Sequence, residues 1–207
     1  MSFAALCAGG AAWTVSEYLI HRFIGHGKKR SMPPTLLGRI SPAGLAYEFN
    51  REHLAHHANP SYFAPTYRKV LAAAVAVPAV AAVATPLVGP RRALAFAAGF
   101  ASVYAGYEVV HRFIHVRPPR GPYSRWARRH HLLHHHKTPR NNHGVTSPVW
   151  DLVFRTYDPV ERVRVPRHVA PTWMVGADGD VKPEYADDYE IVGKPRPGAA
   201  PSMTAQA

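Results

Sequence analysis

The sequence is poor in cysteine and in acidic residues. It has one cysteine, Cys7, among 207 residues. A single thiol excludes an intramolecular disulfide and a zinc finger built on paired cysteines. Asp and Glu number 13 against 25 Lys and Arg, which gives a formal net charge of +12 with histidine neutral. Such a basic excess is typical of proteins that bind nucleic acid or anionic lipid, and of the cytoplasmic edges of membrane spans.

Charge is scarce overall, and three long apolar stretches account for much of that scarcity. They cover residues 2–16, 70–88, and 93–107 with an apolar continuation to 110. A membrane-spanning helix needs about 20 residues. Only 70–88 approaches this length without a charge, and the other two reach it only if the helix continues past Glu17 and Glu108. Buried helices of a soluble bundle are the alternative, but the middle stretch has no polar face, which favours the membrane.

The basic residues indicate how these helices cross the bilayer. Lys and Arg are concentrated in segments 28–69 and 112–140, whereas only Arg91 and Arg92 lie in the short turn at 89–90. By the positive-inside rule, we expect the two basic segments to face the cytoplasm and the turn to face the other side. The first stretch lacks a basic n-region, so we expect a retained helix and not a cleaved signal.

The remaining residues complete the predicted organisation. The pattern predicts an all-α fold over residues 1–158, an integral membrane helical bundle with a cytoplasmic histidine-rich cap. Residues 159–207 form a polar, proline-rich C-terminal tail, with short strands predicted at 172–175 and 189–192. We expect disorder from about residue 195.

Fourteen histidines are a large excess for this length, and most fall in a pattern that occurs twice. The letters HRFI stand at 21–24 and again at 111–114, each time at the end of an apolar stretch. Each copy is followed by an HLxHH motif, at 53–57 and at 131–135. The same order of features therefore occurs twice in the chain: an apolar helix, paired histidines, a connector and an HxxHH motif.

These spacings favour metal binding. In HxxHH the histidines fall at i, i+3 and i+4, which share one face of a helix, and His111 and His115 are also four apart. His21 and His26 are five apart, about 140° around an ideal helix. We expect Gly25 to loosen the helix there and let His26 swing back.

A metal also resolves an electrostatic problem. Buried neutral imidazoles would be unpaired polar groups, and clustered imidazoliums would repel one another, whereas a metal binds the neutral form. Two metals with about five ligands each fit octahedral-type geometry with an open position, unlike a closed four-ligand zinc site. Nitrogen-rich ligation suits iron, copper, zinc or nickel. The ten candidate ligands are His21, His26, His53, His56, His57, His111, His115, His131, His134 and His135.

Other polar residues are candidates for a supporting shell. Glu17 and Glu108 precede their histidines by four and three residues, and each can accept a ring N–H or simply be a helix-end charge at the interface. His130, His136 and Asp151 are further candidates, although the two histidines also fit a basic, wet helix end. His143 fits either a ligand or a supporting residue. His168, in the tail, is expected to be a bystander.

These motifs resemble those of the fatty acid hydroxylase/sterol desaturase superfamily of membrane di-iron oxidases. The matching segments are 17–26, 53–57 with Pro60 and Pro65 after it, 107–115, 131–135 and the closing segment 144–157. The resemblance covers roughly residues 13–158, and EYxxHRFxxH with the two prolines is most similar to the fatty acid 2-hydroxylase branch. Two departures are that the N-terminal helices are fewer and shorter than the family's four spans, and that His143 replaces a residue that is often large and apolar.

The resemblance implies an O2-dependent hydroxylation of a lipid acyl chain, of a fatty acid or sphingolipid type, next to its carbonyl. It implies two Fe ions on the ten histidines, with Zn possible in purified samples. There is no cytochrome b5 domain in the sequence, so electrons are expected from a separate reductase or a ferredoxin- or cytochrome-type donor.

Other functions remain open. Desaturation, carotenoid- or sterol-type hydroxylation and aldehyde chemistry can use the same site. A non-catalytic membrane metal-binding or transport protein is an alternative of another class, but transport would place ligands in mid-span, whereas these histidines follow the helix ends. We expect no nucleic-acid partner, because no recognition motif accompanies the positive charge.

Overall fold

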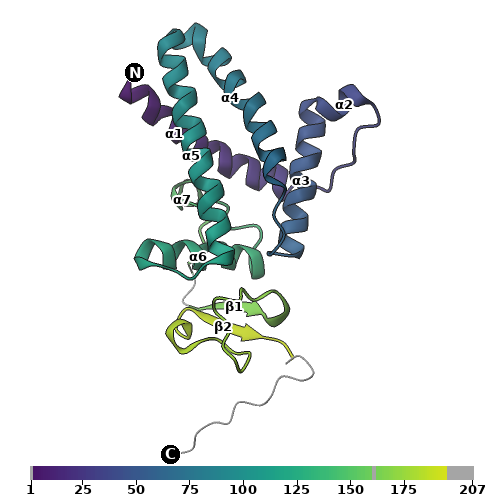
Figure 1. Cartoon of the computed structure of the whole chain (residues 1–207), viewed down its shortest axis with the longest axis vertical. Helices are drawn as coiled ribbons and strands as arrows, with labels where there is room; N and C mark the ends of the chain where they lie inside the picture. The colour runs from purple at the N-terminus through teal and green to yellow at the C-terminus, as the bar shows by residue number, and fades with distance from the viewer. Residues whose placement is uncertain (1, 160–161, 195–207) are drawn as a thin grey trace, which may run out of the picture.

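The computed structural model describes residues 2–159 and 162–194. In the described residues both strands come after the seven α-helices, and Figure 1 labels these helices and strands. They are α1 (Phe3–Leu19), the π-helix η1 (Ile20–Gly25), α2 (Leu36–Ile40), α3 (Pro42–Ala58), α4 (Thr66–Val88), α5 (Pro90–Val116), α6 (Gly121–His136), α7 (Val149–Val153), β1 (Val163–Pro166), the short η2 (Arg167–Val169) and η3 (Pro183–Tyr185), and β2 (Tyr189–Val192).

Three helices are long and apolar enough to cross a membrane. They run over Phe3–Gly25, Thr66–Val88 and Pro90–Val116, with 23, 23 and 27 residues. The first and third continue past Glu17 and Glu108, as the sequence requires for full spans. α4 and α5 form an antiparallel hairpin that turns at Gly89, whose φ of 78° lies in the left-handed region that favours glycine. The all-α, membrane-spanning prediction for this part of the chain is confirmed.

Close contact between α1 and α5 depends on glycine. α1 crosses behind α5 in Figure 1, and the two backbones nearly touch. A Cβ on Gly9 would lie 1.8 Å from the carbonyl oxygen of Phe96, and one on Gly99 would lie 1.9 Å from that of Leu6. Small residues of this kind let membrane helices approach closely, where dispersion forces hold them together.

Residues 162–194 form a small folded lobe. β1 and β2 pair in parallel, with Val163 opposite Tyr189, and the lobe they form packs under α6. The strand predicted at 189–192 is confirmed, but 172–175 is not a strand, since only Val175 makes an isolated bridge, to Val181. The disorder predicted from residue 195 lies outside the described residues. The core shared by α6 and the lobe contains Leu132, Leu133, Val163, Val165, Trp173, Met174 and Tyr189.

The β1 strand was missed, although its sequence carries a signal. Val163 and Val165 are buried, whereas Arg164 between them is exposed. This alternation is the two-residue period of a half-buried strand. The strand has only four residues, so its periodicity is too short to stand out from the polar residues around it.

Gly99→Ala tests the helix crossing. The added methyl meets a backbone carbonyl that cannot rotate away, so the helices must separate, at a cost of about 1–3 kcal/mol. We expect a lower midpoint of thermal unfolding in detergent. Gly106→Ala on the same helix is the matched control, because a Cβ there meets open space and alanine is the better helix former. Equal midpoints for the two variants would contradict the close crossing.

Candidate metal centre

The structure brings all ten candidate ligands together in two groups of five. Within each group, one nitrogen from every histidine lies within 4.8 Å of the others. The first group is His21, His26, His53, His57 and His134, and the second is His56, His111, His115, His131 and His135.

The two groups interlock across the two halves of the sequence. Each half supplies four histidines to one group and one to the other: His56 joins the second group and His134 the first. The groups also touch, since the rings of His57 and His135 stack with centroids 4.0 Å apart and planes 7° apart. α3 and α6 therefore each contribute to both groups, and neither group can form from one half alone.

A π-helical turn brings His21 and His26 together. The backbone N–H of His26 donates to the carbonyl of His21 at 3.0 Å, a contact between residues five apart. That spacing belongs to the π-helix, in which residues five apart come onto one face. The ring centroids are 5.1 Å apart. The two rings are close as expected, but the cause is this turn and not a break at Gly25.

Gly25 instead allows α3 to approach η1. A Cβ at this position would lie 2.8 Å from the Cδ2 atom of His53. Asn50 strengthens the same junction, because its buried amide donates to the carbonyls of Ile24 and Gly25 at 2.8 and 3.0 Å. The end of the first span is thus fixed against the helix that carries three ligands.

Distances between neighbouring ring nitrogens fit a shared cation. Two nitrogens that each lie about 2.1 Å from an ion are about 3.0 Å apart at a right angle and about 3.4 Å apart in a tetrahedron. Five of the nitrogen–nitrogen distances in the two groups are close to the right-angle value, so each group would suit an ion with more than four ligand positions. The Nε2–Nε2 distances are 2.8 Å for His26–His53, 2.9 Å for His26–His134, 3.1 Å for His56–His115, 3.0 Å for His115–His131 and 3.0 Å for His131–His135.

Backbone carbonyls fix the tautomer of three ligands. The Nδ1–H groups of His21, His56 and His134 donate to the carbonyls of His143, Tyr62 and Asn141, the last two at 2.7 and 2.6 Å. This leaves each Nε2 with a lone pair directed into its group, the usual arrangement behind a metal-binding histidine.

Other ring nitrogens have no hydrogen bond within the described part of the chain. Among these buried atoms are the Nε2 atoms of His21, His57 and His111. Buried lone pairs without a donor are costly, and a cation removes that cost. The donor set therefore fits a metal in each group.

The histidines outside the spans are held neutral. Burial lowers the pKa of His57 to about 2, and the neighbouring His26 lowers it further. Burial likewise lowers the pKa of His26 and of His56 to about 4, and the pKa values of the α6 ligands fall well below the ordinary value for the same first cause. At neutral pH these imidazoles are in the form that binds metal.

The two glutamates have partners other than histidine rings among the described residues. The carboxylate of Glu17 accepts from the N–H of Val145 at 2.7 Å and the hydroxyl of Thr146 at 3.3 Å. Glu108 pairs with Lys69 at the start of α4. Glu17 thus fixes the closing loop to the first span, and Glu108 joins the two helices of the hairpin.

Asp151 organises the closing loop that supports His21. Its carboxylate accepts from the N–H groups of His143 and Gly144 and from the hydroxyl of Thr156, each at 2.8 Å. Burial alone would raise the pKa of Asp151, but the hydrogen bonds and the nearby His130 ring hold it well below its usual range. The carbonyl of His143 in turn accepts from His21, so the carboxylate acts on the metal group through the loop.

The remaining histidines lie outside the two groups. The ring of His143 stands beside the first group, with centroids 5.5 Å from His21 and 5.4 Å from His134. His136 lies 5.8 Å from His135 by ring centroids, and His168 lies close enough to add to the lowering of its pKa, which burial brings to about 4.

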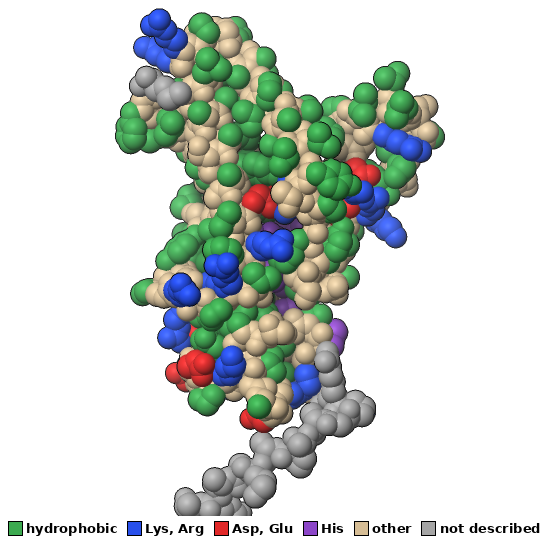
Figure 2. All heavy atoms as spheres, viewed as in Figure 1, with side chains coloured by type: hydrophobic (Ala, Val, Ile, Leu, Met, Phe, Trp, Pro, Cys, Tyr) green, Lys and Arg blue, Asp and Glu red, His purple; other side chains and the backbone are tan. Residues whose placement is uncertain are grey.

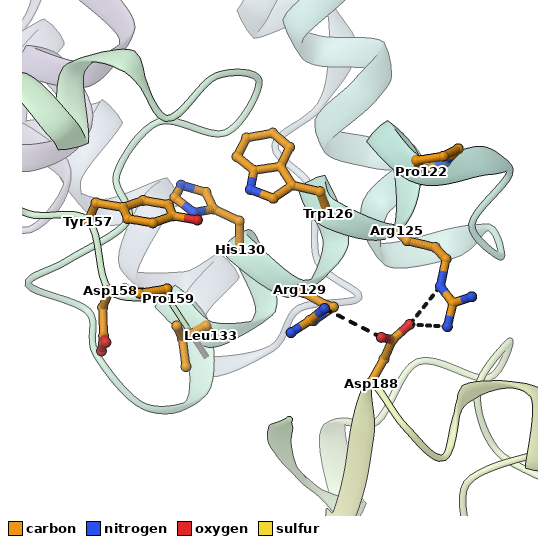
Figure 3. Close-up of a pocket in the computed structure, with 10 residues that line it drawn as sticks. All are labelled: Pro122, Arg125, Trp126, Arg129, His130, Leu133, Tyr157, Asp158, Pro159 and Asp188. Carbon is orange, nitrogen blue, oxygen red and sulfur yellow. Dashed lines mark hydrogen bonds and ion pairs between the residues drawn. The ribbon is translucent and has the colours of Figure 1, made fainter. Parts of the chain in front are cut away.

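The outer face of α6 carries a separate cavity of about 430 Å³, shown in Figure 3. His130 stacks there on Trp126 and Tyr157, with centroids 4.9 and 5.6 Å away. Arg125 and Arg129 both pair with Asp188 of the C-terminal lobe. These α6 positions lie on the side of the helix opposite to its metal-group histidines, so the cavity is not the entrance to the candidate metal centre.

Sequence reasoning missed the residues that act through their backbone. The carbonyls of Tyr62 and Asn141 orient His56 and His134, yet a carbonyl is common to every residue and leaves no mark in a sequence. Tyr62 is held in place by its hydroxyl, which donates to Glu52. Glu52 also pairs with Arg68 at 2.8 Å.

Asp151→Asn tests the closing loop. The amide cannot accept from all three donors, and each lost hydrogen bond to a charged group costs about 1.5–3 kcal/mol. We expect a clear fall in the midpoint of thermal unfolding at neutral pH. Because the pKa of Asp151 is depressed, its contribution is complete above the ordinary Asp pKa of about 3.9 and is lost as pH falls toward the folded value. The difference from the unaltered protein should therefore shrink in acid.

Asp158→Asn is the control for this measurement. Its carboxylate lies 3.9 Å from Lys137 on the surface, a contact worth about 0–1 kcal/mol. If the loop depends on Asp151, Asp158→Asn should lower the midpoint of thermal unfolding much less than Asp151→Asn does. Equal falls in the two midpoints would contradict the role of Asp151.

Comparison with known proteins agrees with this geometry. The family model for fatty acid hydroxylase matches residues 6–156. A ceramide very long chain fatty acid hydroxylase of Saccharomyces cerevisiae is 34% identical over 162 residues, which cover 73% of this chain and 37% of that protein. A dihydroceramide fatty acyl 2-hydroxylase of Arabidopsis thaliana is 29% identical over 160 residues, 72% of this chain and 58% of that one.

A solved structure is similar as well. The hydroxylase domain visible in full-length scs7p superposes with a TM-score of 0.55 at 29% identity, covering 75% of this chain and 55% of that one. The chain spans between 37% and 58% of the length of the two curated relatives described above. The matched region contains all ten histidines of the two groups, and the chain belongs to the fatty acid hydroxylase family.

Proposed function

We propose that the chain is a membrane di-iron enzyme that hydroxylates the acyl chain of a fatty acid or sphingolipid-type substrate. The observation that carries this proposal is the pair of interlocking groups, each with five buried or half-buried histidines whose nitrogens are spaced for a cation with more than four positions. Five nitrogens leave one position of an octahedral-type set for a small ligand. Iron held there would supply the activation of O2 and the oxidation of an unactivated C–H bond.

The protein's own residues hold and shield this chemistry. The ten histidines would bind the two ions, and the carbonyls of His143, Tyr62 and Asn141 keep three of the rings in the binding tautomer. Ile114 and Val145 are fully or almost fully buried in one apolar cluster with Tyr107 and Val110 of α5, the helix that carries His111 and His115, and this cluster would limit the access of water from that side. The overall reaction consumes R–H, O2, two electrons and two protons and yields R–OH and water, so a separate electron donor is required.

The depth of the histidine groups in the membrane supports hydroxylation of the acyl chain at a carbon near the head group. His21 and His111 lie toward the ends of the first and third span-capable helices, not at their centres. A lipid lying beside these helices places the carbons next to its carbonyl near that level, whereas the chain terminus lies deep in the bilayer. The relatives named as acyl 2-hydroxylases and ceramide hydroxylases fit such a substrate.

Expression in a lipid-rich host under isotopically labelled O2 tests the proposal. We expect a lipid with one added, labelled oxygen, and two iron ions per chain by elemental analysis. Zinc can occupy the same nitrogens in purified protein, so iron is supplied during growth. A product that lacks two hydrogens and has no added oxygen would indicate desaturation, and metal content without any product would indicate a binding or transport protein.

The matched variants are His131→Ala and His168→Ala. The first removes a buried ligand of the second group, and we expect loss of metal and product together. The second removes a histidine outside both groups and should retain both. Full product from His131→Ala would refute the assignment.

We propose further that the histidine groups face the cytoplasm. The basic segments flank the groups, and only Arg91 and Arg92 lie at the opposite turn. Alkaline phosphatase inserted after Gly89 should therefore be active in the periplasm of a bacterial host, and the same enzyme inserted after Ala177 should be inactive. The reverse pattern would invert the topology.

A further inference from the structure

Residues 31–47 form a protruding apolar arm. The segment reads SMPPTLLGRISPAGLAY and carries one charge, Arg39. It rises from the end of η1, forms α2, and returns through the first half of α3, as Figure 1 shows. Gly44 allows the tight return, since a Cβ there would lie 2.1 Å from the carbonyl oxygen of Arg39.

The tip of the arm exposes large aliphatic side chains. Leu36, Leu37 and Ile40 are 76%, 78% and 69% exposed. Leu45, on the returning limb, is 51% exposed. In the described part of the chain α3 packs chiefly on η1 and α2, so no other described element covers this tip. Contiguous exposed aliphatic residues of this kind mark a surface that contacts a partner or a membrane.

A polar belt lies at the base of the arm. The backbone N–H of Arg30 donates to Asn50, which is itself bonded to the end of the first span. Ion pairs at the same level, in the middle of α3, join Arg51 and Arg68 to Glu48 and Glu52. Charged side chains are therefore concentrated where the spans end, whereas the residues along the arm are mostly apolar.

The arm extends from this belt in the direction of the spans. From Asn50 to Pro42, α3 rises about 12 Å at 1.5 Å per residue. α4 rises from the same belt beside it, and none of the residues from Thr66 to Val88, all of them described, is buried. Figure 2 shows a notch between the hairpin and the arm, with hydrophobic side chains on both walls.

We propose that residues 31–47 insert into the bilayer as a re-entrant arm, with Leu36, Leu37 and Ile40 in the hydrocarbon of the same leaflet that the bases of α1, α4 and α5 cross. The occupant of the notch is then lipid acyl chains. Continuity favours lipid over a second copy of the chain, since the apolar surface of the arm extends that of α4 above one common polar belt. A rise of about 12 Å stays within one leaflet, which is about 15 Å thick in a core of about 30 Å.

Insertion would also support the metal centre. α3 bears His53, His56 and His57 near its C-terminal end, and its other end is the arm. Lipid around the tip replaces the protein contacts that α3 lacks in the described structure. This consequence concerns the orientation of α3 and does not depend on the identity of the metal or the reaction.

The single cysteine makes depth measurement direct. Cys7→Ser gives a cysteine-free background, and Leu37→Cys introduces one site for an environment-sensitive fluorophore. The full chain is reconstituted in vesicles of phosphatidylcholine and phosphatidylglycerol. Quenching is measured with phosphatidylcholine spin-labelled on its acyl chain and, separately, with aqueous iodide.

Two control sites calibrate the measurement. Val75→Cys lies on the exposed surface of α4, and Ala177→Cys lies on an exposed turn of the C-terminal lobe. We expect Leu37 to behave like Val75, with quenching by the lipid label several-fold stronger than by iodide. If Leu37→Cys does not fold, Ile40→Cys provides a second position on the same tip.

Either of two outcomes would overturn the proposal. Quenching by iodide at the level of Ala177 would place the arm in water. Protection from both quenchers would place it against protein, and crosslinking through the same cysteine would then identify a second copy of the chain. Both results would leave the proposed hydroxylase function untouched, since that function is tested by product and metal content.

Discussion

Ten neutral imidazoles that point lone pairs at one another form the constraint on which this structure depends. Burial keeps the rings of α3 and α6 uncharged, so they do not repel as cations, yet their nitrogens about 3 Å apart gain little without an ion between them. The π-helical turn after α1, the glycine beside His53 and the carbonyls behind three rings all serve this convergence. An ion in each group would remove that cost.

The membrane and the metal centre share the same helices. α1 and α5 cross closely through Gly9 and Gly99, and the same two helices end in His21 and in His111 and His115. The position of the crossing therefore sets the separation of histidines from the two groups. Glu17 strengthens this link by fixing the closing loop to the first span. The packing of the membrane helices and the positions of the histidines are therefore linked. This link suits an enzyme whose substrate lies in the bilayer.

The sequence predicted what depends on side-chain periodicity and missed what depends on the backbone. Uncharged runs identified the helices long enough to span a membrane, and the HxxHH spacing identified histidines that the structure brings together. The sequence did not predict that His56 would join the second group and His134 the first. Residues that share a helix face can be identified from their spacing, but the spacing does not show which residues of other helices they contact. The π-helical turn and the carbonyls of Tyr62 and Asn141 carry no side-chain signature. β1 has only four residues, too few for its alternation to stand out.

The exchange of single histidines between groups has a consequence for metal loading. α3 gives His53 and His57 to one group and His56 to the other, and α6 divides His134 from His131 and His135 in the same way. An ion in either group must therefore fix both helices. A first ion that restricted the motion of α3 and α6 would lower the ordering entropy that remains for a second ion. Metal binding in one group would in this way be coupled to metal binding in the other.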